Sequence, residues 1–180
     1  MSRVLLVLVL TAALSTAARS QSLEYEIKAA FLYNFARFVT WPPDAFASSE
    51  APLSICILGE DPFGPRLDEL VAGERVEKRP LIVRRLERPA EAATCHMLFV
   101  SPSERARFGT ILAAVDTHRV LTVSDTMEFL GAGGHVSFFL ESNRVRFAVN
   151  AAATGGSEFQ VSAKLMQVAR IYEPPAPAAR

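Results

Sequence analysis

Apolar positions in the first part of the chain follow the period of a helix. Residues 23–39 contain neither proline nor glycine, and Phe31, Phe35 and Phe38 recur at a spacing that places them on one side of a helix. The prolines at 42–43 would end it, since proline cannot continue a helix. The spacing predicts a widely buried helix whose phenylalanines anchor it in the core.

Three larger side chains lie off this phenylalanine stripe. Tyr33 and Arg37 fall on another side of the predicted helix, and Trp41 follows its end. Aromatic and arginine side chains are enriched where proteins bind one another. We therefore take Tyr33, Arg37 and Trp41 as candidates for contact with a partner protein.

The pattern then changes to short apolar runs that alternate with amphipathic segments. The runs predict strands, and runs as continuous as "MLFV" are typical of strands covered on both sides. This alternation predicts one α/β domain of three layers, with a mainly parallel sheet between helices on both faces. The predicted strands are residues 53–58, 79–86, 95–101 and 119–125, and the predicted helices are residues 63–71 and 103–116.

Two alternating segments further along predict a C-terminal antiparallel hairpin. Residues 135–141 and 144–150 are separated only by Ser142 and Asn143, which suit a tight turn. The mainly parallel sheet is therefore expected to include one antiparallel pair.

The last part of the chain predicts a final helix at residues 157–172, entered through the segment Thr154-Gly155-Gly156. Beyond it the sequence is rich in proline and has nothing to bury, so residues 174–180 are predicted to be a disordered tail. The positions expected to face inward from this helix are Val161, Leu165, Val168 and Ala169.

The start of the chain has the three parts of an export signal. Arg3 supplies a positive charge, residues 4–13 are apolar, and residues 15–18 are small. The apolar run is too short to span a bilayer comfortably. We expect residues 1–20 to be removed, which leaves an exported, periplasmic domain of residues 21–173. A retained anchor is the alternative; a lipoprotein would need a cysteine after the run, and none is there.

The overall composition limits the kinds of partner. Half of the residues are hydrophobic, and 19 Lys and Arg are balanced by 19 Asp and Glu. A nucleic-acid surface needs a clustered excess of Lys and Arg to neutralise phosphates. Nucleic acid is therefore not expected as a partner.

The chain has two cysteines, Cys56 and Cys95, and both lie in strand-like apolar runs. An exported chain meets an oxidising compartment, in which neighbouring cysteines form disulfides. The sequence does not show whether the two strands are neighbours, and a bridge needs a short Cα separation. A Cys56–Cys95 disulfide and two buried free thiols are therefore the two alternatives.

Motifs for catalysis or cofactor binding are not found in the sequence. His96, His118 and His135 lack the spacing of a metal site, so neither a metal nor another cofactor is expected. The glycine-rich residues 131–135 precede a predicted strand, which is typical of a turn and not of a phosphate loop. Ser124 has no histidine nearby in the sequence to act as a base. A hydrolytic enzyme is therefore the least favoured function, because its nucleophile and base cannot be named.

Small polar residues follow several of the predicted parallel strands. Ligands of open parallel sheets collect at the carboxyl ends of the strands, so these residues predict a small-ligand cleft. The alternative is that they are only turn and helix-cap residues. The candidate ligand-binding residues are Gly59, Asp61, Ser101, Ser103, Ser124 and Asp125.

The order of several segments is that of a known family. The chain resembles the YfiR-like family of small periplasmic proteins in "IKAAFLYNFARFVTWP", "ICILGEDPFG", "LTVSD", "GGHVSFFLESNRVRFAVN" and "SAKLMQVARI". This resemblance covers nearly the whole mature chain and implies an α/β fold, a tendency to dimerise and a regulatory role. It also implies a disulfide, because Cys56 and Cys95 match a structural bridge of the family's namesake in context. A second bridge of that protein has no counterpart here, since residues 130–150 contain no cysteine.

The resemblance also implies a function. The family's namesake represses a membrane-bound diguanylate cyclase by binding that enzyme's periplasmic sensory domain. The chain is therefore expected to inhibit the periplasmic part of an inner-membrane signalling protein, such as a GGDEF diguanylate cyclase, and to act in cyclic-di-GMP signalling and biofilm control. The alternative is a periplasmic sensor that binds a small ligand at the strand edge. The expected partners are thus a membrane protein, a second copy of the chain and a small ligand.

Overall fold

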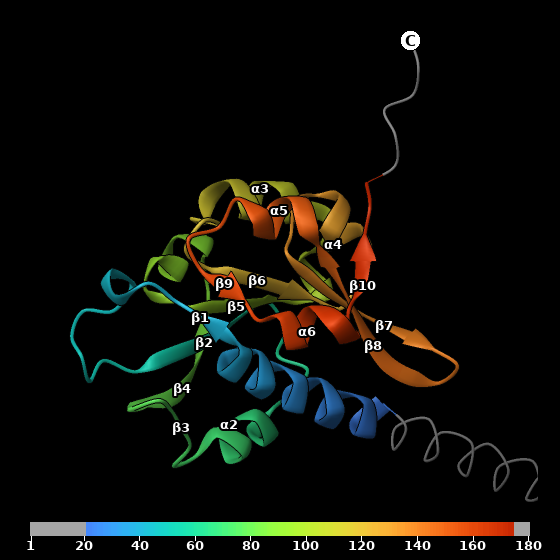
Figure 1. Ribbon diagram of the computed structural model, residues 1–180. Helices are drawn as coiled ribbons and strands as arrows, with labels where there is room; N and C mark the ends of the chain where they lie inside the picture. Colours follow the sequence, from blue (N-terminus) through green and yellow to red (C-terminus); the bar gives the residue numbers. More distant parts are fainter. Residues whose placement is uncertain (1–20, 175–180) are drawn as a thin grey trace, which may run out of the picture.

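An eight-stranded sheet runs through the middle of the computed structural model, which describes residues 21–174 (Figure 1). Its strand order is β10-β8-β7-β6-β5-β2-β4-β3. Five neighbouring strands, β4, β2, β5, β6 and β7, are parallel to one another. Strand β8 is antiparallel to β7, and β3 is antiparallel to β4. The strands of this sheet are β2 (Leu53–Leu58), β3 (Arg75–Val76), β4 (Arg79–Leu86), β5 (Met97–Val100), β6 (Leu121–Ser124), β7 (Val136–Glu141), β8 (Arg144–Asn150) and β10 (Arg170–Tyr172).

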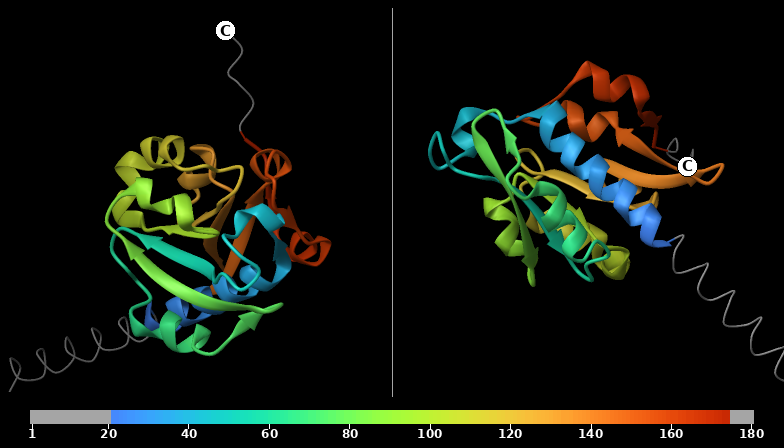
Figure 2. Two further views of the ribbon diagram at one scale, coloured as in Figure 1. Left: turned by 90° about the vertical axis from the view of Figure 1, so that its left-hand side faces the viewer. Right: turned by 90° about the horizontal axis from the view of Figure 1, so that it is seen from below.

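Helices cover both faces of this sheet (Figures 1 and 2). The N-terminal helix, α2 and α6 pack on one face, and α3 and α4 pack on the other. The N-terminal helix occupies residues 21–38 of the described part. The other α-helices are α2 (Pro65–Val71), α3 (Phe108–Ala114), α4 (Glu128–Gly131), α5 (Ala151–Gly155) and α6 (Ala163–Val168). The 3₁₀ helices are η1 (Pro43–Ala45), η2 (Pro89–Thr94) and η3 (Pro102–Arg107), and β1 (Val39–Thr40) and β9 (Gln160–Val161) form a separate antiparallel pair.

The strands owe their burial to continuous apolar sequence. Along β2, Ile55 and Ile57 face the layer that contains the N-terminal helix, and Cys56 and Leu58 face the layer that contains α3. Side chains of a strand alternate between the faces, so a strand that is covered on both sides must be apolar throughout. The prediction of a three-layer α/β domain with a mainly parallel sheet is confirmed.

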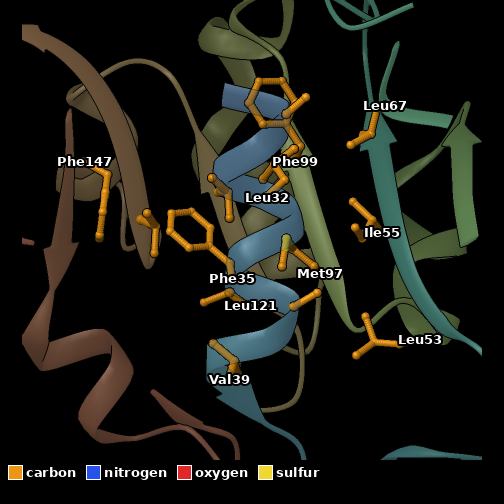
Figure 3. Packing of buried hydrophobic residues seen from close by; sticks show 14 of the residues in the cluster. Leu32, Phe35, Val39, Leu53, Ile55, Leu67, Met97, Phe99, Leu121 and Phe147 are labelled. Carbon is orange, nitrogen blue, oxygen red and sulfur yellow. The ribbon is translucent and has the colours of Figure 1, made fainter. Parts of the chain in front are cut away.

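The N-terminal helix fills the larger of the two core layers (Figure 3). Leu32 and Phe35 are fully buried in the cluster between this helix and the sheet. The ring of Phe35 stacks on Phe138 of β7 with 5.7 Å between centroids and meets Phe147 of β8 edge-on at 5.1 Å. Such aromatic contacts add to the free energy of apolar burial and hold the helix against β7 and β8.

The hairpin has the predicted turn, and its first strand begins one residue later than predicted. Strands β7 and β8 pair antiparallel, and Ser142 and Asn143 both adopt positive φ, at 49° and 58°. Two consecutive residues of positive φ make a turn whose twist matches that of the two strands. The glycine-rich residues 131–135 also form a turn before β7, as predicted, and Gly133 has a φ of 104°.

The C-terminal segment differs from its prediction. Residues 157–172 do not form one helix: a loop is followed by β9, the short helix α6 and β10. Phe159 is buried in the core, β9 pairs with β1, and β10 adds an edge strand to β8. These tertiary pairings outweigh the helical pattern of the sequence. Of the positions expected to face inward, Leu165 is buried and Val168 is 65% exposed.

Two smaller differences concern helix boundaries. Residues 154–156 close α5 and do not open a final helix. The predicted helix at residues 103–116 is divided into η3 and α3, because Arg107 leaves helical geometry with a φ of −127°.

Some predictions concern residues outside the described range. The predicted export signal, residues 1–20, lies there, as do residues 175–180 of the predicted tail. Among the helices of residues 21–174, none combines the length and the apolar character that a membrane crossing requires.

Candidate functional site

The carboxyl ends of three parallel strands bring most of the predicted ligand residues to one edge of the sheet. Leu58 of β2 is level with Val100 of β5, and β5 pairs in turn with β6. Gly59, Ser101 and Asp125 directly follow these three strands. The parallel arrangement, predicted from sequence, is what makes these loops neighbours.

Gly59 is required by the close approach of two of these loops. Its φ is +90°, and a Cβ atom added there would lie 2.6 Å from Ser103 Oγ and 2.7 Å from Glu104 Cγ. No larger side chain fits without displacing the loop after β5. Gly59 therefore shapes the edge without offering a side chain of its own.

A cleft of about 620 Å³ opens at this edge. Three predicted residues, Asp61, Ser101 and Ser103, form part of its wall, and the start of the N-terminal helix forms another part. Ser124 and Asp125 are not in the wall, since Ser124 is fully buried and the Asp125 side chain is 3% exposed. The wall residues that the sequence did not point to are Gln21, Ser22, Tyr25, Glu60, Pro62 and Pro102.

Three polar side chains of the wall, those of Asp61, Ser101 and Ser103, already make hydrogen bonds within the chain. Asp61 Oδ1 accepts from the backbone N–H groups of Phe63 and Gly64, at 2.8 and 3.2 Å, which shapes the entry to α2. Ser101 Oγ caps η3, and Ser103 Oγ accepts from the backbone N–H of Glu60 at 3.0 Å. These are the roles that the turn-and-cap alternative predicts.

Behind the cleft, a buried charged cluster joins the N-terminal helix to the end of β6. Asp125 Oδ2 accepts from Tyr25 Oη at 2.7 Å and from Lys28 Nζ at 3.0 Å. Lys28 also donates to Glu24, one turn earlier in the helix. Burial and the bond to Asp125 raise the pKa of Tyr25 well above its usual value. The cluster fixes the position of the helix over this edge.

Ser157 and His135 are the one serine and histidine whose side chains are hydrogen-bonded to each other within residues 21–174. They do not form a nucleophile and its base. His135 Nδ1 accepts from the backbone N–H of Thr122 at 3.1 Å, so the ring proton lies on Nε2, which is 3.3 Å from Ser157 Oγ. That nitrogen donates and cannot remove the proton of Ser157. Burial lowers the pKa of His135 to about 4, so the ring is neutral.

His96, which directly precedes β5, makes the same kind of hydrogen bonds. Its Nδ1 accepts from the backbone N–H of Ser54 at 3.1 Å, and its Nε2 donates to the carbonyl of Ala45 at 3.2 Å. Burial lowers its pKa to about 4. Both histidines therefore hold backbone groups in place. Within residues 21–174, no three His, Cys, Asp or Glu side chains are grouped as metal ligands.

The candidate partner-binding residues do not share one environment. Tyr33 and Arg37 lie at the surface, with the Arg37 guanidinium 5.6 Å from the centre of the Tyr33 ring and Tyr33 Oη donating to Glu74 at 2.7 Å. Trp41 is 6% exposed, and its Nε1 donates to the carbonyl of His96 at 3.1 Å. Trp41, a candidate for contact with a partner protein, is therefore buried and not at the surface, because β1 turns the chain inward after the helix. Phe38, expected in the core, is instead 37% exposed.

The predicted disulfide is confirmed. Cys56 on β2 and Cys95, two residues before β5, are bonded, with their Cα atoms 6.0 Å apart. Strands β2 and β5 are neighbours in the sheet, which brings the two cysteines together. No cysteine remains free.

Fold and site together define a three-layer α/β domain whose edge cleft carries capping residues and a buried ion-pair cluster. A family model described as YfiR/HmsC-like matches residues 25–170. The chain therefore belongs to the YfiR/HmsC-like family. That family is regulatory rather than catalytic and is periplasmic. No curated protein matches the chain closely enough to serve as a relative.

Proposed function

We propose that this protein is a periplasmic regulator that binds and inhibits the sensory part of a membrane signalling protein, with a diguanylate cyclase as the target. The observation that carries the proposal is the family match, which extends from Tyr25 in the N-terminal helix to Arg170 in β10. It covers both layers of helices and nearly the whole sheet, so the proposal concerns the entire domain.

The chemistry of the edge supports a role in binding. The polar wall residues cap turns and helices, and the buried histidines hold backbone amides. Nothing in these contacts activates a nucleophile. A domain of this kind acts through its surface, and the exposed side of the N-terminal helix offers Tyr33 and Arg37 to a partner.

Deletion of the gene is expected to raise cyclic-di-GMP and biofilm formation, because the target cyclase is released from inhibition. The wild-type chain restores the low level when expressed in the deletion strain. A Tyr33→Ala/Arg37→Ala double variant accumulates in the periplasm but does not restore it, whereas Arg144→Ala, which removes an exposed arginine from β8, does. Unchanged cyclic-di-GMP in the deletion strain, with the cyclase present, contradicts the inhibitor role.

The second candidate function is a small-ligand sensor, and the 620 Å³ cleft at the strand edge is the observation that favours it. A ligand there would contact Asp61, Ser101 and Ser103. A compound from a metabolite library that raises the unfolding temperature of the wild-type protein should have a weaker effect on Ser103→Ala. If no compound stabilises the protein, or if the variant responds equally, the cleft is not a ligand site.

A further inference from the structure

The outer side of the N-terminal helix carries an accessible apolar ridge. Leu23, Ile27 and Phe38 are 58%, 40% and 37% exposed, and the half-buried Ala30 and Asn34 lie between them. Residues of an α-helix are 100° apart, so these five positions fall within about 80° of its circumference. We call Leu23, Ile27, Ala30, Asn34 and Phe38 the outer ridge.

The outer ridge is unusual for a helix on the surface of a domain. Leu32 and Phe35 form the opposite, buried side of the helix, and Val39, which directly follows the helix, is buried as well (Figure 3). A helix that is buried on one side normally presents charged and polar residues on the other. Here three of the seven exposed large apolar side chains within residues 21–174 stand on one helix face. Figure 2 shows this helix along the outside of the sheet, where a partner can reach it.

The spacing along the outer ridge indicates the shape of its occupant. Leu23, Ile27, Ala30, Asn34 and then Arg37 are separated by four, three, four and three residues. This is the alternation with which one helix packs against another in a coiled coil, and the small Ala30 allows close approach at the centre. The ridge therefore fits a helix better than an extended strand or a small molecule.

Charge and polarity restrict the chemistry of that helix. Arg37 forms no ion pair with a carboxylate of residues 21–174, although its guanidinium is held beside the Tyr33 ring. A carboxylate on the partner would form an ion pair with Arg37. Asn34 lies at a seam position, where an amide or hydroxyl opposite it fixes the register of two helices.

A second copy of the chain matches these features less well. Parallel, in-register pairing would bring the two Arg37 side chains together at the seam. Antiparallel pairing over the whole ridge would place Ile27 opposite Asn34, an apolar group against an amide that then lacks a partner. A different chain, with its own acidic and polar positions, avoids both defects.

We propose that the outer ridge is the docking seam for an amphipathic helix of the membrane signalling partner, with a carboxylate opposite Arg37 and a polar side chain opposite Asn34. The proposal rests on the proposed function, since it names the surface through which the regulator holds its target.

The test measures binding of the purified mature protein to the purified periplasmic domain of a diguanylate cyclase whose product rises when the gene is deleted. Ile27→Glu and Phe38→Glu each weaken binding about 30-fold, as expected when a charge enters an apolar contact of the interface. Arg37→Glu weakens it about 10-fold. Ile171→Glu on β10 is the matched control, because Ile171 is a similarly exposed isoleucine, and it binds as the wild type does. Circular dichroism verifies that all four variants are folded.

The other outcomes separate this proposal from the proposed function. If the wild type binds the cyclase domain and Ile27→Glu binds equally well, the docking seam is overturned while the inhibitor role stands. If Ile171→Glu is as weak as Ile27→Glu, binding does not depend on the ridge. If the wild type does not bind at all, both the inhibitor role toward this cyclase and the docking seam are contradicted. If Ile27→Glu instead dissociates a wild-type dimer in sedimentation, a second copy occupies the ridge, which overturns the assignment to the partner.

Discussion

The free energy of unfolding should fall by about 4 kcal/mol when Cys56 and Cys95 are both replaced by alanine. The bridge joins residues 39 apart in sequence, and closing a loop of that length restricts the unfolded chain by about this amount in the chain-entropy description. Both cysteines lie in the core layer beneath α3. Urea unfolding of the two proteins under oxidising conditions measures it.

The single variants provide the control for this disulfide prediction. Cys56→Ala and Cys95→Ala each break the same bridge, so each should lose nearly as much stability as the double variant. If the two single losses instead add up to the double loss, the cysteines contribute through packing alone. Reductant should lower the stability of the wild type towards that of the variants and leave the double variant unchanged.

Acidification from pH 7 to pH 5 should also cost about 4 kcal/mol of stability through His96 and His135. Burial lowers the pKa of each to about 4, against an ordinary value of 6.5. The neutral imidazoles contribute fully above pH 6.5, and this contribution is lost as the pH falls towards 4, because the unfolded chain takes up protons first. At pH 5 the loss is about 2 kcal/mol for each histidine.

Urea unfolding across this pH range tests the assignment to these two side chains. Asparagine can place an amide oxygen where each Nδ1 accepts a backbone N–H, so His96→Asn and His135→Asn preserve that bond and remove the titration. Each variant should remove about half of the pH dependence. A dependence that is unchanged in the His96→Asn/His135→Asn double variant would show that other groups are responsible.

Both predictions bear on the proposed function, because a regulator that binds a membrane protein would need a rigid surface. The N-terminal helix is fixed at one end by the cluster of Tyr25, Lys28 and Asp125 and along its length by Phe35. Conditions that loosen the domain should therefore weaken binding of the partner before they unfold the chain completely.

Most of the sheet could be predicted from the sequence because its signals are local. The strands at 53–58, 79–86 and 144–150 have the predicted bounds, since continuous or alternating apolar runs admit few other structures. The hairpin follows from two residues that suit a tight turn. The C-terminal segment could not be predicted in this way, because its strands exist only through pairing with β1 and β8.

The candidate site shows the same division. The residues after β2, β5 and β6 were found because the ends of parallel strands share an edge. The buried cluster of Tyr25, Lys28 and Asp125 was not found, since it joins residues about 100 positions apart. No pattern of the sequence states which turn of the helix lies over which strand.

The sequence by itself determined the class of fold, the hairpin and the segments from which the core is built, because apolar period and turn chemistry act over a few residues. Tertiary structure decided that the two cysteines meet and that Trp41 is buried while Phe38 is exposed. It also decided which side of the N-terminal helix stays exposed. Those outcomes depend on strand order and on the rotation of one helix against the sheet. Helical spacing gives the width of an apolar stripe, but packing against the neighbouring layers determines which part of that stripe is buried.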